Sequence, residues 1–325
     1  MNNSSPKISI LVPIYGVDKY IECCARSVFE QTYDNIEYIF VDDCSPDHSM
    51  DILKRVMEEY PNRKSGINII RHEHNKGLAA ARNTGVDSAT GDFILHVDSD
   101  DYIDKDLVEK LVLEQIRSNA DIVCGGCKVE YSNHVETWAE VLNRNKDVVA
   151  QKLIARKLHN NIWGRLIKRS LYKEHNIRVE EGINNSEDYQ VIPRLYYYSN
   201  TISSVNSSYY HYNKQNVGSY TQARSLKNDM QIIASFDILK NFFWNKGKDY
   251  QDALNIGEIT LISWGLKHLN KVDEQDKYFS ILMNRLDQID KKYYKEVDIL
   301  SRFAFKLRNK KAIITFLNIY DKFKR

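Results

Sequence analysis

The sequence lacks any long apolar run. None of its stretches reaches the roughly 20 consecutive apolar residues that a membrane-spanning helix needs, so we do not expect an integral membrane protein. It also lacks a strong charge excess. The formal net charge of +2 provides no overall attraction to nucleic acid. Five cysteines, an odd number, and no signal peptide before the first apolar run predict a reducing, cytoplasmic location.

Three common functional signatures are absent as well. The sequence has no G-x-G-x-x-G segment, no phosphate-binding P-loop and no G-x-S-x-G segment. These absences argue against a dinucleotide-dependent dehydrogenase, a P-loop nucleotidase and a serine hydrolase. With 325 residues and 42% hydrophobic content, the chain can form one large domain, or one domain with an appendage.

Strand-like and helix-like segments alternate through the N-terminal third of the sequence. Buried strands are predicted at Ile8–Val12, Ile36–Val41, Asn68–Ile70 and Phe93–Val97. Such alternation predicts an α/β fold with a mostly parallel sheet covered by helices on both faces. Ligands of such sheets bind beyond the carboxyl ends of the strands, where Pro13 to Tyr15, Asp42–Asp43 and Asp98 to Asp100 fall.

The segment after the fourth predicted strand carries three carboxylates within four positions, Asp98, Asp100 and Asp101. Alternate side chains of an extended chain point the same way, so Asp98 and Asp100 are expected to project together. Such a pair suits Mg²⁺ or Mn²⁺, which fills its other positions with water and phosphate oxygens. The alternative is a solvated acidic turn in which Asp104 caps the next helix.

The C-terminal two thirds of the chain have a weaker pattern. A fifth strand is predicted at Ile122–Val129, and polar residues dominate from Tyr131 to Lys157. Two tyrosine clusters, residues 196–198 and 209–212, suit the faces of sugar rings and equally suit an ordinary core. From Leu226 onward the apolar residues recur with helical spacing.

Six segments in this order resemble a family 2 glycosyltransferase. They are ILVPIYGVDKYI, EYIFVDDCSPDHS, NKGLAAARNTGV, GDFILHVDSDDYI, NIWGRLIKRSLY and SEDYQ. The resemblance covers residues 6–221, roughly two thirds of the chain. It implies a GT-A fold, Rossmann-like, over residues 1–221, with a nucleotide-sugar half (1–130) and an acceptor half (131–221). Residues 222–325 are expected to form a C-terminal helical region.

The resemblance implies an inverting transferase that moves a sugar from a nucleoside diphosphate, usually a UDP-sugar, to an acceptor hydroxyl. Such enzymes assemble polysaccharides and other cell-surface glycans, so a glycan or lipid-linked acceptor is expected. Two other functions stay open. A sugar-1-phosphate nucleotidyltransferase would share the sheet, the metal and the nucleotide, but should carry a basic, glycine-rich loop after the first strand. The second open function is a non-catalytic module that binds a nucleotide or a glycan.

The resemblance also implies roles for single residues. Those for nucleotide-sugar binding are Pro13, Tyr15, Asp43, Lys76, Asp98 and Ser99, and those for metal binding are Asp100, Asp98 and His211. Trp163 would lie under the sugar or the acceptor, and Arg82 would brace Asp98. The sequence departs from the commoner family pattern at Cys44, where glycine is usual, and at Gly16, where asparagine is usual.

The catalytic pair implied by the resemblance is Glu187 and Asp188. Asp188 would take the proton of the attacking acceptor hydroxyl, while Glu187 would orient it or share that hydroxyl. Two adjacent carboxylates in a partly closed site raise one another's pKa, which suits a base that works near neutrality. The alternative is a helix start that places acids near its N-terminus after Ser186 as N-cap.

Residues 302–325 contain eight basic residues and one acidic residue, Asp321, with apolar residues between them. A basic amphipathic segment of this kind can make peripheral contact with the anionic inner leaflet of a membrane, where a lipid-linked acceptor would be located. The alternative is a helix that packs on the catalytic domain and exposes a solvated basic face.

Overall fold

The structure is a computed structural model that describes residues 5–139, 145–216 and 225–323, with side chains described to residue 318. The chain divides into two compact units. One comprises residues 1–149 with 161–218, and the other comprises residues 150–160 with 219–325. The expected domain boundary at residue 221 lies outside the described residues.

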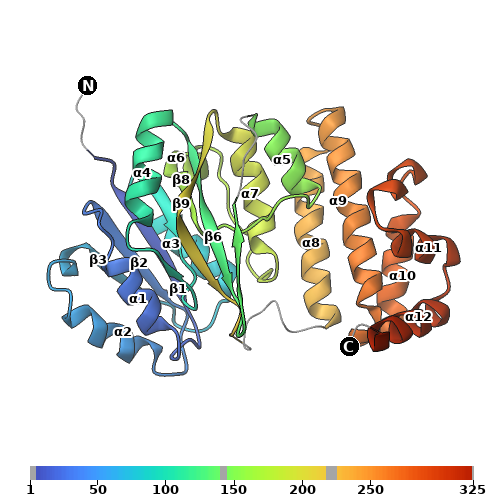
Figure 1. Ribbon diagram of the computed structural model, residues 1–325, viewed down its shortest axis with the longest axis horizontal. Helices are drawn as coiled ribbons and strands as arrows, with labels where there is room; N and C mark the ends of the chain where they lie inside the picture. The colour runs from blue at the N-terminus through green and yellow to red at the C-terminus, as the bar shows by residue number, and fades with distance from the viewer. Residues whose placement is uncertain (1–4, 140–144, 217–224, 324–325) are drawn as a thin grey trace. The chain divides into compact units, whose positions relative to one another are not determined.

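The first unit is built around one sheet, which Figure 1 shows covered by helices. In sheet order its strands are β3 (Ile67–Arg71), β2 (Ile36–Asp42), β1 (Ile8–Ile14), β4 (Phe93–His96), β8 (Arg165–Lys168), β6 (Ile122–Glu130), β9 (Ile202–Asn213) and β5 (Tyr102–Ile103), with β7 (Val135–Trp138) paired to β6. Strands β3, β2, β1 and β4 are parallel. Strand β8 runs antiparallel to both β4 and β6, and β6 pairs in parallel with β9.

The α/β fold class and the four N-terminal strands are confirmed. Every residue of β1 is buried, as its continuous apolar run predicts. The later strands were harder to predict. The first seven residues of β9, ISSVNSS, are mostly polar and give no apolar alternation, and β5 contains only two residues. The mixed second half of the sheet therefore depends on pairing between distant segments.

The helices of the first unit lie between the strands. They are α1 (Ile21–Phe29), α2 (Ser49–Glu58), α3 (Leu78–Ser88), α4 (Leu107–Ser118), α6 (Arg169–Glu174) and α7 (Glu187–Tyr198), with the short 3₁₀ helix η1 (Lys64–Gly66); α5 (Lys146–Ile154) crosses the boundary between the units. The apolar face of α1, with Ile21, Cys24, Ala25 and Val28, is buried. The N-cap position of α1 belongs to Tyr20, and the nearby Asp18 N–H donates to Oδ2 of Asp47 at 2.9 Å.

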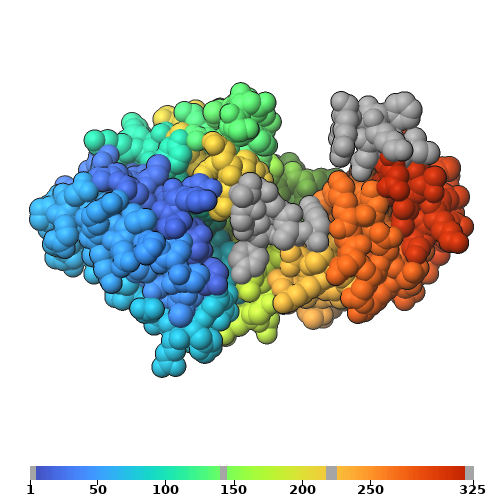
Figure 2. All heavy atoms as spheres, turned by 90° about the horizontal axis from the view of Figure 1, so that it is seen from below, coloured from blue at the N-terminus to red at the C-terminus, as the bar shows by residue number. Residues whose placement is uncertain are grey.

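The second unit is helical, as predicted from the apolar spacing after Leu226. Its helices are α8 (Leu226–Phe243), α9 (Lys248–Lys267), α10 (Gln275–Leu286), α11 (Ile299–Leu307) and α12 (Lys310–Phe323), with 3₁₀ helices η2 (Leu269–Lys271) and η3 (Lys291–Glu296). On the face seen in Figure 2, the orange and red atoms of these helices form one continuous surface. Within the described residues, no helix has the length and apolar character needed to cross a membrane.

Candidate active site

The carboxyl end of β2 is followed by a buried carboxylate, Asp43. Its Oδ1 accepts a hydrogen bond from the Lys76 N–H and its Oδ2 accepts one from the Gly77 N–H, both at 2.8 Å. Oδ1 also lies 2.7 Å from Nδ1 of His72, whose Nε2 is 2.9 Å from Oγ1 of Thr84. Asp43 thus fixes the loop that leads into α3. No role was predicted for His72, because its contacts come from distant parts of the sequence.

The turns after β1 and β2 are joined by short polar side chains. The N–H groups of Gly16 and Val17 donate to the hydroxyls of Ser45 and Ser49 at 2.9 and 3.0 Å. Burial alone would raise the pKa of Asp47, but hydrogen bonds from Ser49 and Ser45 lower it to about 2. Cys44 has a φ of +60°, which explains why glycine is usual there. The two turns therefore form one ordered rim beside Asp43.

The acidic segment after β4 is held by Tyr210 on β9. The Asp98 N–H donates to the Tyr210 hydroxyl at 3.0 Å, and that hydroxyl donates to Oδ2 of Asp101 at 2.6 Å. The other oxygen of Asp101 accepts from the Asn213 N–H at 2.8 Å. Burial, then the charges of Asp100 and Asp98, raise the pKa of Asp101 well above its usual range. Asp101 is thus a buried structural carboxyl that the sequence pattern did not distinguish from its neighbours.

The other two carboxylates of this segment, Asp98 and Asp100, are partly exposed. Burial, then the charge of Asp98, raises the pKa of Asp100, and its Oδ2 accepts from the Asn216 amide at 2.7 Å. A cation would relieve this repulsion. The described part of the chain contains no group of three side chains arranged to hold a metal. Mg²⁺ typically needs only one or two protein carboxylates when it binds phosphates, so Asp98 and Asp100 fit such an ion.

His211, the third predicted metal ligand, lies on β9 between two carboxylates. Its Nδ1 is 2.8 Å from Oε1 of Glu130, and its Nε2 is 2.9 Å from Oδ1 of Asp104. The ring also stacks on Tyr102 with centroids 4.3 Å apart. Since both nitrogens have protein partners, metal binding by His211 would require one contact to break, and it stays a prediction.

Asp104 was expected, under the alternative interpretation, to cap the helix that follows it. That expectation is wrong. The N-cap position of α4 is Asp106, while the Asp104 carboxylate accepts from the Tyr209 N–H at 2.9 Å and lies beside His211. Asp104 therefore attaches β9 to the segment after β4.

Arg82 on α3 connects this acidic segment with the start of α7. Its guanidinium is buried; Nη2 lies 2.9 Å from Oδ1 of Asp98, and Nε donates to Oε1 of Glu187 at 2.9 Å. The predicted brace between Arg82 and Asp98 is confirmed. The contact with Glu187 was not predicted, since no local pattern relates residues so far apart in the sequence.

Asp188 follows Glu187 in the first turn of α7 and is partly exposed. Burial, then the charge of Glu187, raises the pKa of Asp188 to about 7, while Arg82 opposes the shift. Burial also raises the pKa of Glu187. Ser186 occupies the N-cap position with a φ of +62°, but its side chain makes no capping hydrogen bond. The geometry thus gives Asp188 a carboxyl that titrates near neutrality.

Two asparagines attach α3 to the loop that precedes Asp188. The Asn83 amide donates to the Val179 carbonyl at 2.9 Å, and the Val179 N–H donates to Oδ1 of Asn83 at 3.1 Å. Oδ1 of Asn184 accepts from the Ala79 N–H at 3.0 Å, which satisfies one of the free donors at the N-terminus of α3. Sequence reasoning missed both asparagines, although Asn83 lies within one of the six matched segments.

The remaining predicted residues differ in exposure. Tyr15 and Lys76 have exposed side chains, whereas Pro13 and Ser99 are buried. Trp163 is only 8% exposed, and its ring stacks on Tyr210 with centroids 4.3 Å apart. The structure therefore brings Asp98, Glu187 and Asp188 together around Arg82, and places Asp43 in a separate network with His72.

Comparisons with known proteins bear on the family and the fold of the chain. The family described as Glycosyl transferase family 2 matches residues 9–191. The glycosyltransferase EpsJ of Bacillus subtilis is 33% identical over 190 residues, which make up 56% of this chain and 54% of EpsJ. The chain spans about half the length of the curated relatives it matches first.

Solved structures share the fold. S. aureus TarS 1-349 in complex with UDP-GlcNAc has a TM-score of 0.74 and 18% identity, covering 97% of this chain and 92% of that one. The mannosyltransferase PcManGT from Pyrobaculum calidifontis, in complex with GDP-Man and Mn²⁺, has a TM-score of 0.58 and 16% identity, covering 98% and 89%. At these identities the likeness shows the GT-A fold, which agrees with the expectation from sequence.

Proposed function

The chain belongs to glycosyl transferase family 2, and from this we propose that it transfers a sugar from a UDP-sugar to an acceptor hydroxyl with inversion at the anomeric carbon. The observation that carries the proposal is the contact of Arg82 with both Asp98 and Glu187. This contact connects the acidic segment after β4, which suits a metal and a diphosphate, with the first turn of α7, which carries Asp188. A UDP-sugar is supported by TarS, a structural neighbour that binds UDP-GlcNAc.

The donor side would use the carboxyl ends of β1, β2 and β4. Asp98 and Asp100 would hold Mg²⁺ or Mn²⁺; Mn²⁺ is bound in the neighbour PcManGT. When bound, the metal neutralises the charge that develops on the leaving diphosphate. The nucleotide would lie at the carboxyl ends of β1 and β2, in contact with Pro13, Tyr15 and Asp43. Two further residues would complete this site, Lys76 at the entry to α3 and the buried Ser99.

The acceptor side would use Asp188 as the base. Its pKa of about 7 means that a large fraction of the side chain is ionised near neutral pH and can take the proton of an attacking hydroxyl. Glu187, fixed by Arg82, would orient the first turn of α7. Trp163 would contact the sugar or acceptor, and His211 would supply a further metal ligand if it left one of its carboxylate partners.

We also propose the setting of this reaction. Residues 1–221 would be the transferase domain and residues 222–325 a helical appendage. The acceptor would be a glycan or a lipid-linked glycan in cell-surface polysaccharide assembly, reached from the cytoplasmic face of the membrane. Residues 302–325 would make the peripheral contact. The side chains of residues 319–323, and residues 324 and 325, lie outside the part of the chain that is described.

Thermal unfolding with UDP, GDP, CMP and dTDP, each with and without Mn²⁺, tests the donor site. A hundredfold excess of ligand over its Kd stabilises the folded state by about 2.7 kcal/mol. We expect UDP to raise Tm only with Mn²⁺, and Asp100→Ala to remove the effect. The control is Asp51→Ala, because the Asp51 side chain is 76% exposed. If no nucleotide shifts the wild type, a binding site for a UDP-sugar is contradicted.

A further inference from the structure

Helices α11 and α12 expose large apolar side chains. On α11 these are Ile299, 81% exposed, Phe303, 56% exposed, and Leu307, 38% exposed. Their spacing of four residues places them along one face of the helix. Phe316 on α12 is 39% exposed. A cluster of exposed apolar side chains of this kind typically marks an interaction surface.

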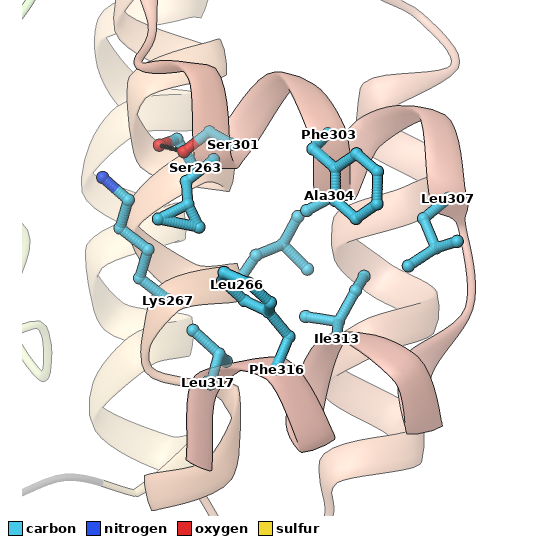
Figure 3. A pocket seen from close by; sticks show the side chains of 11 residues that line it. Ser263, Leu266, Lys267, Ser301, Phe303, Ala304, Leu307, Ile313, Phe316 and Leu317 are labelled. Carbon is cyan, nitrogen blue, oxygen red and sulfur yellow. Dashed lines mark hydrogen bonds between the residues drawn. The ribbon is translucent and has the colours of Figure 1, made fainter. Parts of the chain in front are cut away.

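Between these helices lies a small apolar groove that is partly open to solvent. Figure 3 shows Phe303 and Leu307 of α11 and Ile313 and Phe316 of α12 around it, with Leu266 of α9 also lining it. Phe303, Leu307 and Phe316 therefore combine exposure with a place at the groove, and Ile299 lies one helical turn from Phe303 on the same face of α11. We call these four exposed residues, Ile299, Phe303, Leu307 and Phe316, the α11–α12 face.

The two helices that carry this face are rich in basic residues. Residues 299–318 contain no acidic residue and five basic residues, Arg302, Lys306, Arg308, Lys310 and Lys311. Arg308 pairs with Asp287 and Lys310 with Asp276. Across the described residues, Lys306 and Lys311 form no ion pair. The face thus combines exposed apolar groups with positive charge that the protein itself leaves unneutralised.

We propose that the α11–α12 face docks on the surface of an anionic phospholipid bilayer. Ile299, Phe303 and Phe316 would enter the boundary between headgroups and acyl chains, and Lys306 and Lys311 would contact lipid phosphates. Charge complementarity selects this occupant, because the helices that carry the apolar face also carry the unpaired cations of Lys306 and Lys311, which a purely apolar partner would not require. A bilayer also accepts an apolar face without matching its shape. The proposal names the residues of the peripheral contact, and its test does not depend on sugar transfer.

Flotation of the full-length protein with lipid vesicles tests this proposal. The vesicles contain either phosphatidylcholine alone or equal parts phosphatidylcholine and phosphatidylglycerol. We expect the wild type to float with the anionic vesicles only, and less so at high salt, because salt screens the attraction of exposed charges. Ile299→Ser with Phe303→Ser should lower the partition coefficient by about tenfold or more, since these side chains would no longer enter the bilayer.

Two further variants define which groups act. Lys306→Glu with Lys311→Glu should lower partitioning into anionic vesicles and remove most of its salt dependence. Leu113→Ser with Ile116→Ser is the matched control, because these residues of α4 are 55% and 60% exposed and lie in the first unit. This control should float like the wild type. If the apolar double variant fails to fold, Phe316→Ser provides the same test.

Three results would overturn the proposal. The first is a wild type that does not float with anionic vesicles, or floats equally with neutral ones. The second is an apolar variant that is folded and still floats like the wild type. The third is a wild type that sediments as a dimer and binds no vesicles, together with an apolar variant that sediments as a monomer. The face would then bind a second copy of the chain and not a membrane. The UDP-dependent shift in Tm is measured on the same variants. A loss of UDP binding can then be distinguished from a loss of vesicle binding.

Discussion

Nε of Arg82 donates to Oε1 of Glu187 at 2.9 Å, although the two residues are 105 positions apart. The same guanidinium lies against Asp98. Burial would lower the pKa of Arg82, but the charges of Asp98 and Glu187 raise it, so the side chain stays charged. One buried cation thus holds two carboxylates, one after β4 and one at the start of α7.

Replacing Arg82 should be costly. In Arg82→Met the buried carboxylate of Glu187 and the adjacent Asp98 lose their cation, and breaking a buried ion pair from one side costs about 3–5 kcal/mol. Urea unfolding measures the loss. Arg117→Met is the control, because the Arg117 side chain is 76% exposed and solvent screens its pair with Glu114. Equal losses in the two variants would contradict a structural role for the buried pair.

Asp188→Asn should abolish sugar transfer and leave UDP affinity nearly unchanged, because the amide cannot accept a proton from the acceptor. In the wild type, transfer should increase with pH up to about 7, where the carboxylate becomes the dominant form. Release of UDP under acceptor saturation measures the rate. Glu181→Gln, an exposed change in the same loop, is the control. Equal loss of transfer and of UDP affinity would refute the role of Asp188 as the base.

The raised pKa of Asp188 also affects stability. The folded pKa of about 7 lies above the ordinary value of 3.8, so in the unfolded chain the carboxyl loses its proton at lower pH. The free energy of unfolding should therefore fall as pH rises from about 4 to about 7, at about 1.4 kcal/mol per unit of pKa difference at most. Asp188→Asn should be more stable relative to the wild type at pH 8 than at pH 4. Urea unfolding at the two pH values checks this, and an unchanged difference would show that the carboxyl is not perturbed.

Tyr210→Phe removes one hydroxyl from the acidic segment. Asp101 then loses one of its two hydrogen-bond donors and the Asp98 N–H loses its acceptor, which should cost about 1–3 kcal/mol. We also expect a smaller Mn²⁺-dependent shift with UDP, because Asp98 would be less firmly held. Tyr209→Phe is the control. Its hydroxyl makes no hydrogen bond within the described residues, and a similar loss there would mean that the Tyr210 hydroxyl has no special role.

Cys44→Gly should stabilise the protein by about 0.5–1 kcal/mol. The left-handed conformation of Cys44 costs about 1–2 kcal/mol for a residue with a Cβ atom, and the greater freedom of glycine in the unfolded chain offsets part of this gain. The comparison is Cys23→Gly, an exposed position within α1, where glycine should cost up to about 1 kcal/mol. Thermal and urea unfolding measure both. If Cys44→Gly is destabilising, the Cys44 side chain makes a favourable contact that outweighs the strain.

The first half of the sheet could be predicted because its information is local. Each of β1, β2 and β4 is an apolar run with polar residues at its carboxyl end, so both the strand and the edge of the sheet that binds ligands follow from residues close in sequence. Strand β9 lacks that signal. Its place beside β6 depends on tyrosines that contact the segment after β4, as Tyr210 does.

The candidate site divides in the same way. The sequence identified four carboxylates of the site, because each lies in a cluster of acidic residues within a segment that resembles the family. They are Asp98, Asp100, Glu187 and Asp188. His72 and Asn184 were not, because each acts through one contact with a distant residue, and a single histidine or asparagine in a polar loop is too common to indicate a role. For the same reason, the sequence did not indicate that Asp101 and Asp104 accept hydrogen bonds from residues of β9.

The attachment of α3 to the loop before Asp188 has a consequence for protein engineering. Asn83, Arg82 and the backbone of Ala79 contact residues between Val179 and Glu187, so the two segments must fit one another. A chimera that takes residues 161–216 from a relative would bring a loop shaped for a different helix. Residues 77–88 should therefore be transplanted together with that segment, and the smallest exchangeable unit that contains this loop is discontinuous in sequence.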